Sequence, residues 1–181
     1  MERLFQLIFQ NHPEFTTEIT GVSEDRILRL EHLGHLSRLP QDYRTFLKYM
    51  GEDMGRVKVI QWGESHWAPG DVRKYQYDIA VDYTSILREY KRDPENLKLG
   101  CQWLLHECNA KPEDYLMIGI NTRGGDNGNF FLDLRSENLK VVEICLTLGI
   151  IERSPSLAEF LFTDSFRREV STFLHTKEWL V

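Results

Sequence analysis

The segment from Leu116 to Leu134 constrains the fold most, because apolar and polar residues alternate on both sides of an Asn-Gly pair. Alternation with a period of two is typical of a strand with one buried face. Asn127 and Gly128 both tolerate positive φ, which a tight strand connection requires. The sequence therefore predicts an antiparallel hairpin with a protruding loop over 122–126. The apolar residues expected on its inward face are Ile118, Ile120, Phe130 and Leu132.

Further strands and helices are predicted on both sides of this hairpin. Lys140–Ile144 fits a third antiparallel strand, and Gly55–Trp62 has the alternation of another, followed by a loop over Gly63–Gly70. Helical spacing extends over Ile79–Leu87 and over Leu97–Cys108, and Ser154 or Ser156 is placed to begin a helix carrying Leu157, Phe160 and Leu161. An amphipathic tail follows from Phe166 to Leu174.

The amino-terminal third is predicted to be helical. Leu4, Leu7 and Ile8 share one helix face before Pro13 interrupts it, and Ser23 is a suitable N-cap for a second helix with Ile27 and Leu30 on its apolar face. A third helix starts near Pro40 and stops at Gly51, and its apolar positions are Tyr43, Phe46, Leu47 and Met50. Without a repeat or a linker, residues 1–181 are predicted to form one α+β domain, mainly an antiparallel sheet with helices packed against it.

Composition limits the classes of partner. The 181 residues carry 22 basic and 28 acidic side chains, a formal net charge of −6, which argues against direct binding to nucleic acid and favours a basic protein partner. No apolar run is long enough to cross a bilayer, so no membrane association is expected. The three cysteines show no disulfide framework, which favours a reducing, cytoplasmic location.

Residues with catalytic or metal-binding chemistry are scattered. The chain has no nucleophile elbow, P-loop, zinc-protease helix or dinucleotide-binding glycine motif. Zinc ligands usually come from closely spaced pairs, so buried thiols and a solvated helix face explain the available side chains better than a metal site does. No metal and no cofactor are expected. The side chains considered for metal binding are Cys101, His106, Cys108 and Cys145, and separately His32 and His35.

Two segments are candidates for partner contact. Asp126 and Asn127 follow Gly124 and Gly125 in the hairpin loop, where Asp126 either meets a partner or caps neighbouring amides of the turn. Trp62 and Trp67 flank a short loop and either anchor an interface or close the edge of the core. An enzyme would have to use Asp126, Asp133 or His66 as acid or base, in a pocket that shifts their pKa values.

Three stretches, in this order, resemble the SUKH superfamily of fungal cell-wall-synthesis regulators and bacterial immunity proteins. The first is Ile27–Gly34 followed by Leu39–Leu47, which is similar to the family's Leu-Pro-x-Asp-Tyr-x-x-Phe-Leu opening. The second is the Gly-Gly-Asp hairpin ending in Leu-Asp-Leu, and the third is Ser156–Leu161. The motif residues are Leu39, Pro40, Asp42, Tyr43, Phe46, Leu47, Gly124, Gly125, Asp126, Asp133, Phe160 and Leu161.

The resemblance covers residues 27–161 and leaves a helical extension over 1–22 and the tail over 166–181 outside it. It implies a SUKH-like fold and a non-enzymatic, cytoplasmic immunity protein, an antitoxin that binds and neutralises a cognate bacterial toxin. A net charge of −6 suits a basic target such as a nuclease domain. The fungal members imply the alternative of a regulatory scaffold that recruits other proteins.

Overall fold

The computed structural model describes residues 1–33, 38–55, 60–64, 74–92, 111–121, 129–145 and 149–162. Its α-helices are α1 (Glu2–Asn11), α2 (Glu24–Leu33), α3 (Gln41–Met50), α4 (Tyr83–Arg92) and α6 (Leu157–Phe162), with short 3-10 helices η1 (Pro13–Thr17) and η2 (Pro112–Asp114). Its strands are β1 (Ile60–Glu64), β2 (Lys74–Ala80), β3 (Tyr115–Asn121), β4 (Asn129–Asp133), β5 (Val141–Cys145) and β6 (Gly149–Ser154).

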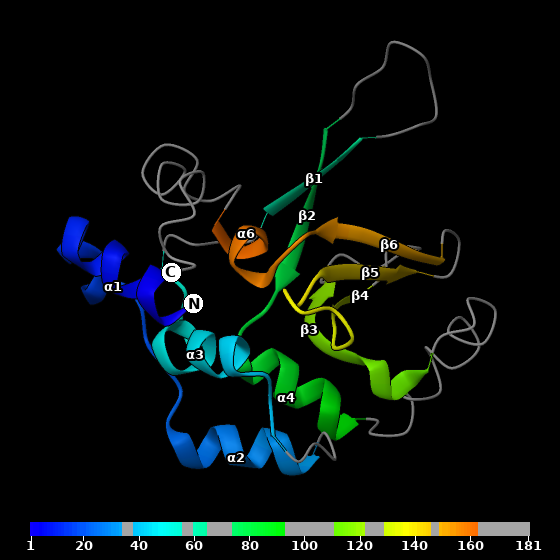
Figure 1. Cartoon of the computed structure of the whole chain (residues 1–181), viewed down its shortest axis with the longest axis horizontal. Coiled ribbons are helices and arrows are strands. Elements are labelled where there is room, and N and C mark those ends of the chain that lie inside the picture. The colour runs from blue at the N-terminus through cyan, green and yellow to red at the C-terminus, as the bar shows by residue number, and fades with distance from the viewer. Residues whose placement is uncertain are drawn as a thin grey trace.

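The described strands form an antiparallel sheet in sequence order, β1-β2-β3-β4-β5-β6. β2 joins β3 through only two residue pairs, Ile79 with Asn121 and Ala80 with Ile120. Figure 1 shows β3–β6 on one side of the molecule, α2, α3 and α4 gathered on another, and β1 and β2 extending away from both. The α+β fold is confirmed.

The predicted hairpin is confirmed, but the expectation of one inward face is wrong. Leu116 pairs with Leu132, and Met117 pairs with Phe131. All four side chains are at most 4% exposed although the two pairs occupy opposite faces, so the sheet is covered on both sides here. A bulge between Met117 and Gly119 also shifts the alternation by one residue.

Two other predictions need correction, and one strand was missed. β1 continues to Glu64, into the loop expected over Gly63–Gly70, because its pairing with β2 extends to Lys74. The segment from Ile79 is not helical at its start, since β2 runs to Ala80 and α4 begins at Tyr83. Asp82 sets that boundary by accepting a hydrogen bond from the Ser85 amide (2.9 Å). β6 was not predicted at all.

The remaining predicted elements that fall on described residues agree with the structure. α1, α2 and α3 begin and end close to the expected positions, and β5 occupies the third strand. The Ser156 hydroxyl accepts a hydrogen bond from the Glu159 amide (3.2 Å), which makes Ser156 the cap of α6. Residues 56–59, the helix predicted over Leu97–Cys108 and the tail over Phe166–Leu174 lie outside the described residues.

One hydrophobic cluster joins the helices to the sheet. α3 contributes Tyr43, Phe46 and Leu47, each at most 1% exposed, and the hairpin contributes its buried residues to the same cluster. α6 packs on β4, with the rings of Phe160 and Phe130 5.4 Å apart. The predicted common core of the 40–50 helix and the hairpin is therefore confirmed.

The amino-terminal helix also packs on this core. The Phe5 ring stacks on Tyr49 of α3 at 4.7 Å and meets Phe162 of α6 edge-on at 5.9 Å. The Tyr49 hydroxyl donates a hydrogen bond to Glu2, which raises the pKa of Tyr49 to about 12. Residues 1–22, expected outside the family resemblance, thus form part of the common core.

The carboxyl end of α3 is where three segments of backbone meet. The Leu47 carbonyl accepts hydrogen bonds from the amides of Gly51 (3.0 Å) and Val22 (2.8 Å), and the Gly51 carbonyl accepts one from the Tyr83 amide (2.6 Å). A Cβ on Gly21 would lie 1.7 Å from the Lys48 carbonyl oxygen, so only glycine allows this approach. α3 is thereby fixed to the starts of α2 and α4.

We expect Leu47→Ala to lower the free energy of unfolding by about 2–5 kcal/mol, because Leu47 is fully buried and truncation leaves a cavity. The matched control is Leu28→Ala on α2, where the leucine is 50% exposed and a change within about 0.5 kcal/mol is expected. Urea unfolding measures both. Equal midpoints for the two variants would contradict the core assignment.

Gly21→Ala is expected to destabilise the fold by about 3 kcal/mol or more, because the new methyl group forces the two backbone segments apart. The loss should appear in thermal unfolding, whereas Gln10→Ala on the exposed side of α1 should leave the transition in place. A Gly21→Ala protein that melts with the parent would show that the two segments are not in contact.

Candidate partner-binding surface

The strand register places the connections β1–β2, β3–β4 and β5–β6 at one end of the sheet. Asn121 of β3 lies beside Ile79 of β2, and the β1–β2 pairing continues outward from there to Glu64 and Lys74. Asn129 of β4 pairs with Ile144 of β5, next to the end of that strand. The segments 65–73, 122–128 and 146–148 therefore leave the sheet at the same end, which we call the loop end. α4, η2 and α6 join the sheet at the opposite end.

The residues predicted to contact a partner belong to β1 or to segments that follow strand ends at the loop end. Trp62 lies in β1, directly opposite Gln76 of β2, in a ribbon that extends beyond β3. Trp67, Asp126 and Asn127 lie outside the described residues, as do Gly124, Gly125 and His66. The register thus brings together the ends of the strands that carry these segments, and contact by the loop side chains stays a prediction.

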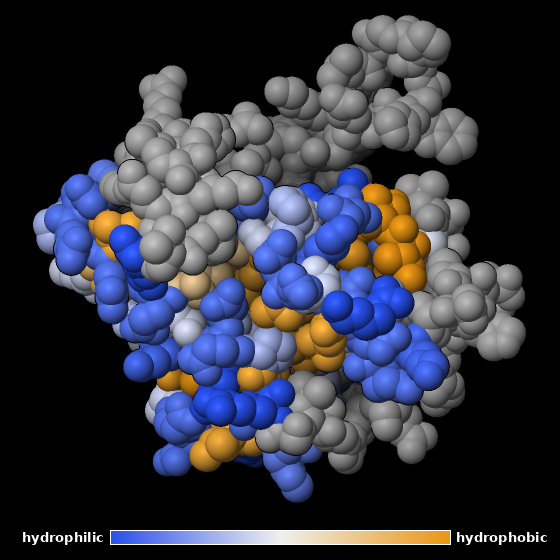
Figure 2. Space-filling model, in the orientation of Figure 1, coloured by the Kyte–Doolittle hydropathy of each residue, from blue (hydrophilic) through white to orange (hydrophobic). Residues whose placement is uncertain are grey.

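The residues of β6 change from uncharged at the loop end to charged farther along the strand. Gly149, Ile150 and Ile151 are uncharged and partly exposed, whereas Glu152 and Arg153 follow them toward α6. Figure 2 shows an apolar patch on this part of the visible face, where β6 runs in Figure 1. An apolar centre beside charged residues is the usual composition of a protein-binding surface.

The opposite end of the sheet is closed by a polar clamp around Arg135. Its Nε and Nη2 donate to the two Asp133 carboxylate oxygens (2.9 and 2.8 Å), and Nη2 also donates to the Tyr115 hydroxyl (2.6 Å). The guanidinium carbon lies 5.0 Å from the centre of the Tyr115 ring. These groups join the starts of β3 and of the β4–β5 turn.

The clamp bears on the proposed acid–base role of Asp133. Hydrogen bonds from the Arg135 side chain outweigh the effect of burial and lower the pKa of Asp133. A carboxyl group of lowered pKa stays ionised near neutral pH, so it has no proton to donate as a general acid and is a weaker base than an ordinary carboxylate. The hydrogen bonds from Arg135 hold the Asp133 carboxylate against the turn.

A buried carboxylate positions the Leu39-Pro40 turn. Glu31 of α2 is 5% exposed, and one of its oxygens accepts a hydrogen bond from the Leu39 amide (2.7 Å). Arg44 of α3 donates to Glu31 and to Glu24, so the guanidinium joins α2 to α3. The motif that opens with Leu39 thus depends on two residues, Glu31 and Arg44, that the sequence analysis did not single out.

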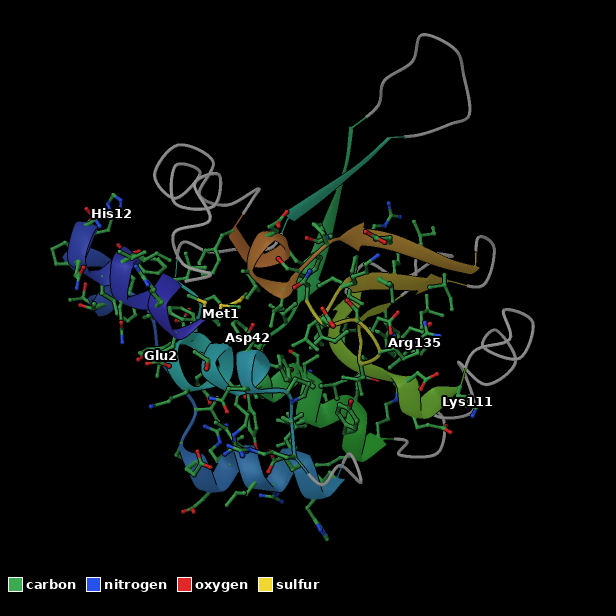
Figure 3. The ribbon with its side chains drawn as sticks, in the orientation of Figure 1. Met1, Glu2, His12, Asp42, Lys111 and Arg135 are labelled. Atoms are coloured by element: carbon green, nitrogen blue, oxygen red, sulfur yellow. The ribbon has the colours of Figure 1, made fainter. Side chains whose placement is uncertain are left out.

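A signal for Glu31 exists in the sequence. Position 31 lies four residues after Ile27 and one after Leu30, on the side of the helix that must be buried, and an acid there needs a cation or an amide. Arg44 falls one turn inside the next helix, within reach. Asp42 of the same motif lies instead beside the Met1 ammonium group (3.3 Å), as Figure 3 shows.

A second arginine connects α2 to α4. The Arg26 guanidinium lies 4.4 Å from the centre of the Tyr83 ring and pairs with Glu52, while the Tyr83 hydroxyl donates to the Arg26 carbonyl (2.9 Å). Thr84 adds a hydrogen bond to Glu52 (3.3 Å). Every group in this network is paired, which suits positioning of helices rather than chemistry on a substrate.

Metal ligands do not cluster in the described part of the chain, where no three His, Cys, Asp or Glu side chains could hold an ion. His32 is exposed in the last turn of α2, and Cys145 ends β5. Cys101, His106, Cys108 and His35 lie outside the described residues. Among the described helices, none is long and apolar enough to span a membrane.

Comparison of the chain with protein-family models gives no match, and comparison with curated proteins gives none either.

The stability of Glu31→Gln at different pH values tests whether the buried Glu31 carboxylate stabilises the fold. Burial disfavours the charged form, but the Leu39 amide and Arg44 outweigh it and lower the pKa of Glu31. A lowered pKa stabilises the fold above the ordinary value of 4.5, and this stability is lost as pH falls through the lower, folded-state value. At pH 7 the variant should therefore be less stable by about 1–3 kcal/mol.

The difference between variant and parent should shrink as the pH falls below about 4.5, because the parent then loses the same charge. Chemical unfolding at pH 7 and pH 3 measures this change, with Glu137→Gln on the exposed β4–β5 turn as the control. A difference that is equal at both pH values would show that Glu31 does not titrate against folding.

Proposed function

We propose that this chain is a non-enzymatic, SUKH-like protein-binding module that acts as a cytoplasmic immunity protein and neutralises a bacterial toxin. The observation that carries the proposal is the placement of the three motifs that resemble the family. The Leu-Pro opening forms α3 and the turn before it, the second motif supplies β3 and β4, and the third forms α6. All three contribute to one core.

The distribution of paired groups supports binding rather than catalysis. Arg26 of α2, Arg44 of α3 and Arg135 of the β4–β5 turn are each paired with a carboxylate. The segments with Trp62, Trp67, Asp126 and Asn127 belong to β1 or follow strands that end at the loop end. A binder that covers an active site needs shape and charge complementarity, which loops carried by a packed sheet can provide.

Charge supports a basic target. A chain with a net charge of −6 attracts a cationic protein over the Debye length and repels the nucleic acid that such a protein would bind. A nuclease domain is the corresponding class of toxin, since it must carry positive charge to reach a phosphate backbone.

The direct test is protection of bacterial cells that express the toxin encoded by the gene next to this one. Cells with the chain should grow and those without it should not, and the toxin should be retained by the tagged chain in a pull-down. Asp126→Lys is expected to reduce protection, because it reverses a charge in the proposed contact loop.

Asp25→Lys is the matched control, since it makes the same change in net charge on the exposed face of α2. It should leave protection intact. Failure of the parent chain to protect against any neighbouring toxin would overturn the immunity function. Equal protection by the two variants would remove the loop from the binding surface.

A further inference from the structure

The hydroxyl group of Tyr43 is buried in the core without a hydrogen-bond partner. Tyr43 is 0% exposed, and of the buried side-chain nitrogen and oxygen atoms in the described part of the chain, its hydroxyl oxygen alone has no partner. Tyr83 of α4 is equally buried, but its hydroxyl donates to the Arg26 carbonyl (2.9 Å). A hydroxyl that leaves water without gaining a hydrogen bond raises the free energy of the folded state. Tyr43 therefore disfavours the arrangement that buries it.

The groups around the Tyr43 hydroxyl place it at the junction of α3 with α4. Burial raises the pKa of Tyr43, and the nearby Tyr90 and Asp82 raise it further. Tyr90 lies near the end of α4, and Asp82 directly precedes this helix. The Asp82 carboxylate accepts a hydrogen bond from the Ser85 amide (2.9 Å), so it already caps α4. The unpaired hydroxyl thus belongs to the contact between these two helices.

α4 is held to the other helices by polar contacts at its amino-terminal end. The Tyr83 amide donates to the Gly51 carbonyl at the end of α3 (2.6 Å), and the Tyr83 hydroxyl joins the helix to α2. In the later turns of α4, the ion pair between described residues joins Arg92 to Glu89 of the same helix (3.9 Å). Apolar burial holds these turns to the core, with Ile86 0% exposed. The first turn of α4 can therefore act as a pivot for the turns that follow it.

We propose that the later turns of α4 separate from α3 in a local opening that pivots on Tyr83 and gives the Tyr43 hydroxyl access to water. The closed state buries the apolar side chains but leaves this hydroxyl unpaired, so the hydroxyl lowers the free energy needed for the opening. Local openings let a folded chain expose new surface without unfolding as a whole. This conformational device goes beyond the proposed binding function and does not depend on it.

Hydrogen exchange of the full chain, followed by nuclear magnetic resonance, tests the opening. The amides of Leu87–Arg92 are expected to exchange at least about tenfold faster than the most protected amides of β4, whose exchange requires global unfolding. Added urea should accelerate exchange in α4 less than in β4, because a local opening exposes less surface. One common rate with one dependence on urea would show that α4 opens only when the whole fold does, which would overturn the proposal.

Tyr43→Phe removes the hydroxyl and keeps the ring, so it should stabilise the closed state. Its α4 amides are expected to exchange about tenfold more slowly than those of the parent, and its melting temperature should rise by about 2–4 °C. Tyr83→Phe is the matched control, since it removes a hydroxyl that has a partner from an equally buried ring, and it should lower the melting temperature. An equal or lower melting temperature for Tyr43→Phe would show that its hydroxyl is paired in solution, for instance with an internal water, and would overturn the proposal.

Discussion

The rest of the structure depends on the hydrogen bonds at the carboxyl end of α3. A helix end leaves its last carbonyl groups without partners, and a buried carbonyl without a partner is costly. Here the Leu47 carbonyl is satisfied by two amides from different segments, and the Gly51 carbonyl by the first residue of α4. The same bonds that complete α3 therefore fix where α2 and α4 begin. Gly21 makes this possible because any side chain there would occupy the space of the Lys48 carbonyl.

The ion pairs that hold the helices and turns together lie away from the loop end of the sheet. The helices and the clamp around Arg135 join the sheet at one end, and the paired charges of Glu31 and Arg44 hold the helices to each other. The opposite end carries the connections over 65–73, 122–128 and 146–148. Binding residues are commonly found on loops that a packed scaffold positions, so this arrangement agrees with the proposed binding function.

Periodicity in the sequence was sufficient to predict the helices that are buried on one side. It was also sufficient for elements that start or end at a proline, a glycine or an Asn-Gly pair. α3 follows from its apolar spacing between Pro40 and Gly51, and the β3–β4 hairpin follows from alternation around Asn127 and Gly128. β6 was missed because Gly149-Ile150-Ile151-Glu152 does not alternate, so the period-two signal of a strand is absent from it. β2 was misassigned at Ile79 because its apolar residues run directly into those of α4.

The candidate site was harder to predict than the fold, for a physical reason. The position of Glu31 on the buried side of α2 signals that it needs a partner, but its partners, an amide eight residues away and Arg44 in another helix, lie outside any local pattern. The placement of the three connections at one end of the sheet likewise follows from strand order, and the sequence of a single strand does not contain that order. The loop residues Asp126 and Asn127 remain a prediction.

The junction between β2 and β3 has a consequence for how such a molecule can change over time. Two residue pairs attach the β1–β2 ribbon to β3. Lengthening or shortening the ribbon beyond Ile79 would therefore leave the pairing of β3 with β4 unchanged. A ribbon attached at so few positions can gain or lose residues without altering the register of the strands that follow it.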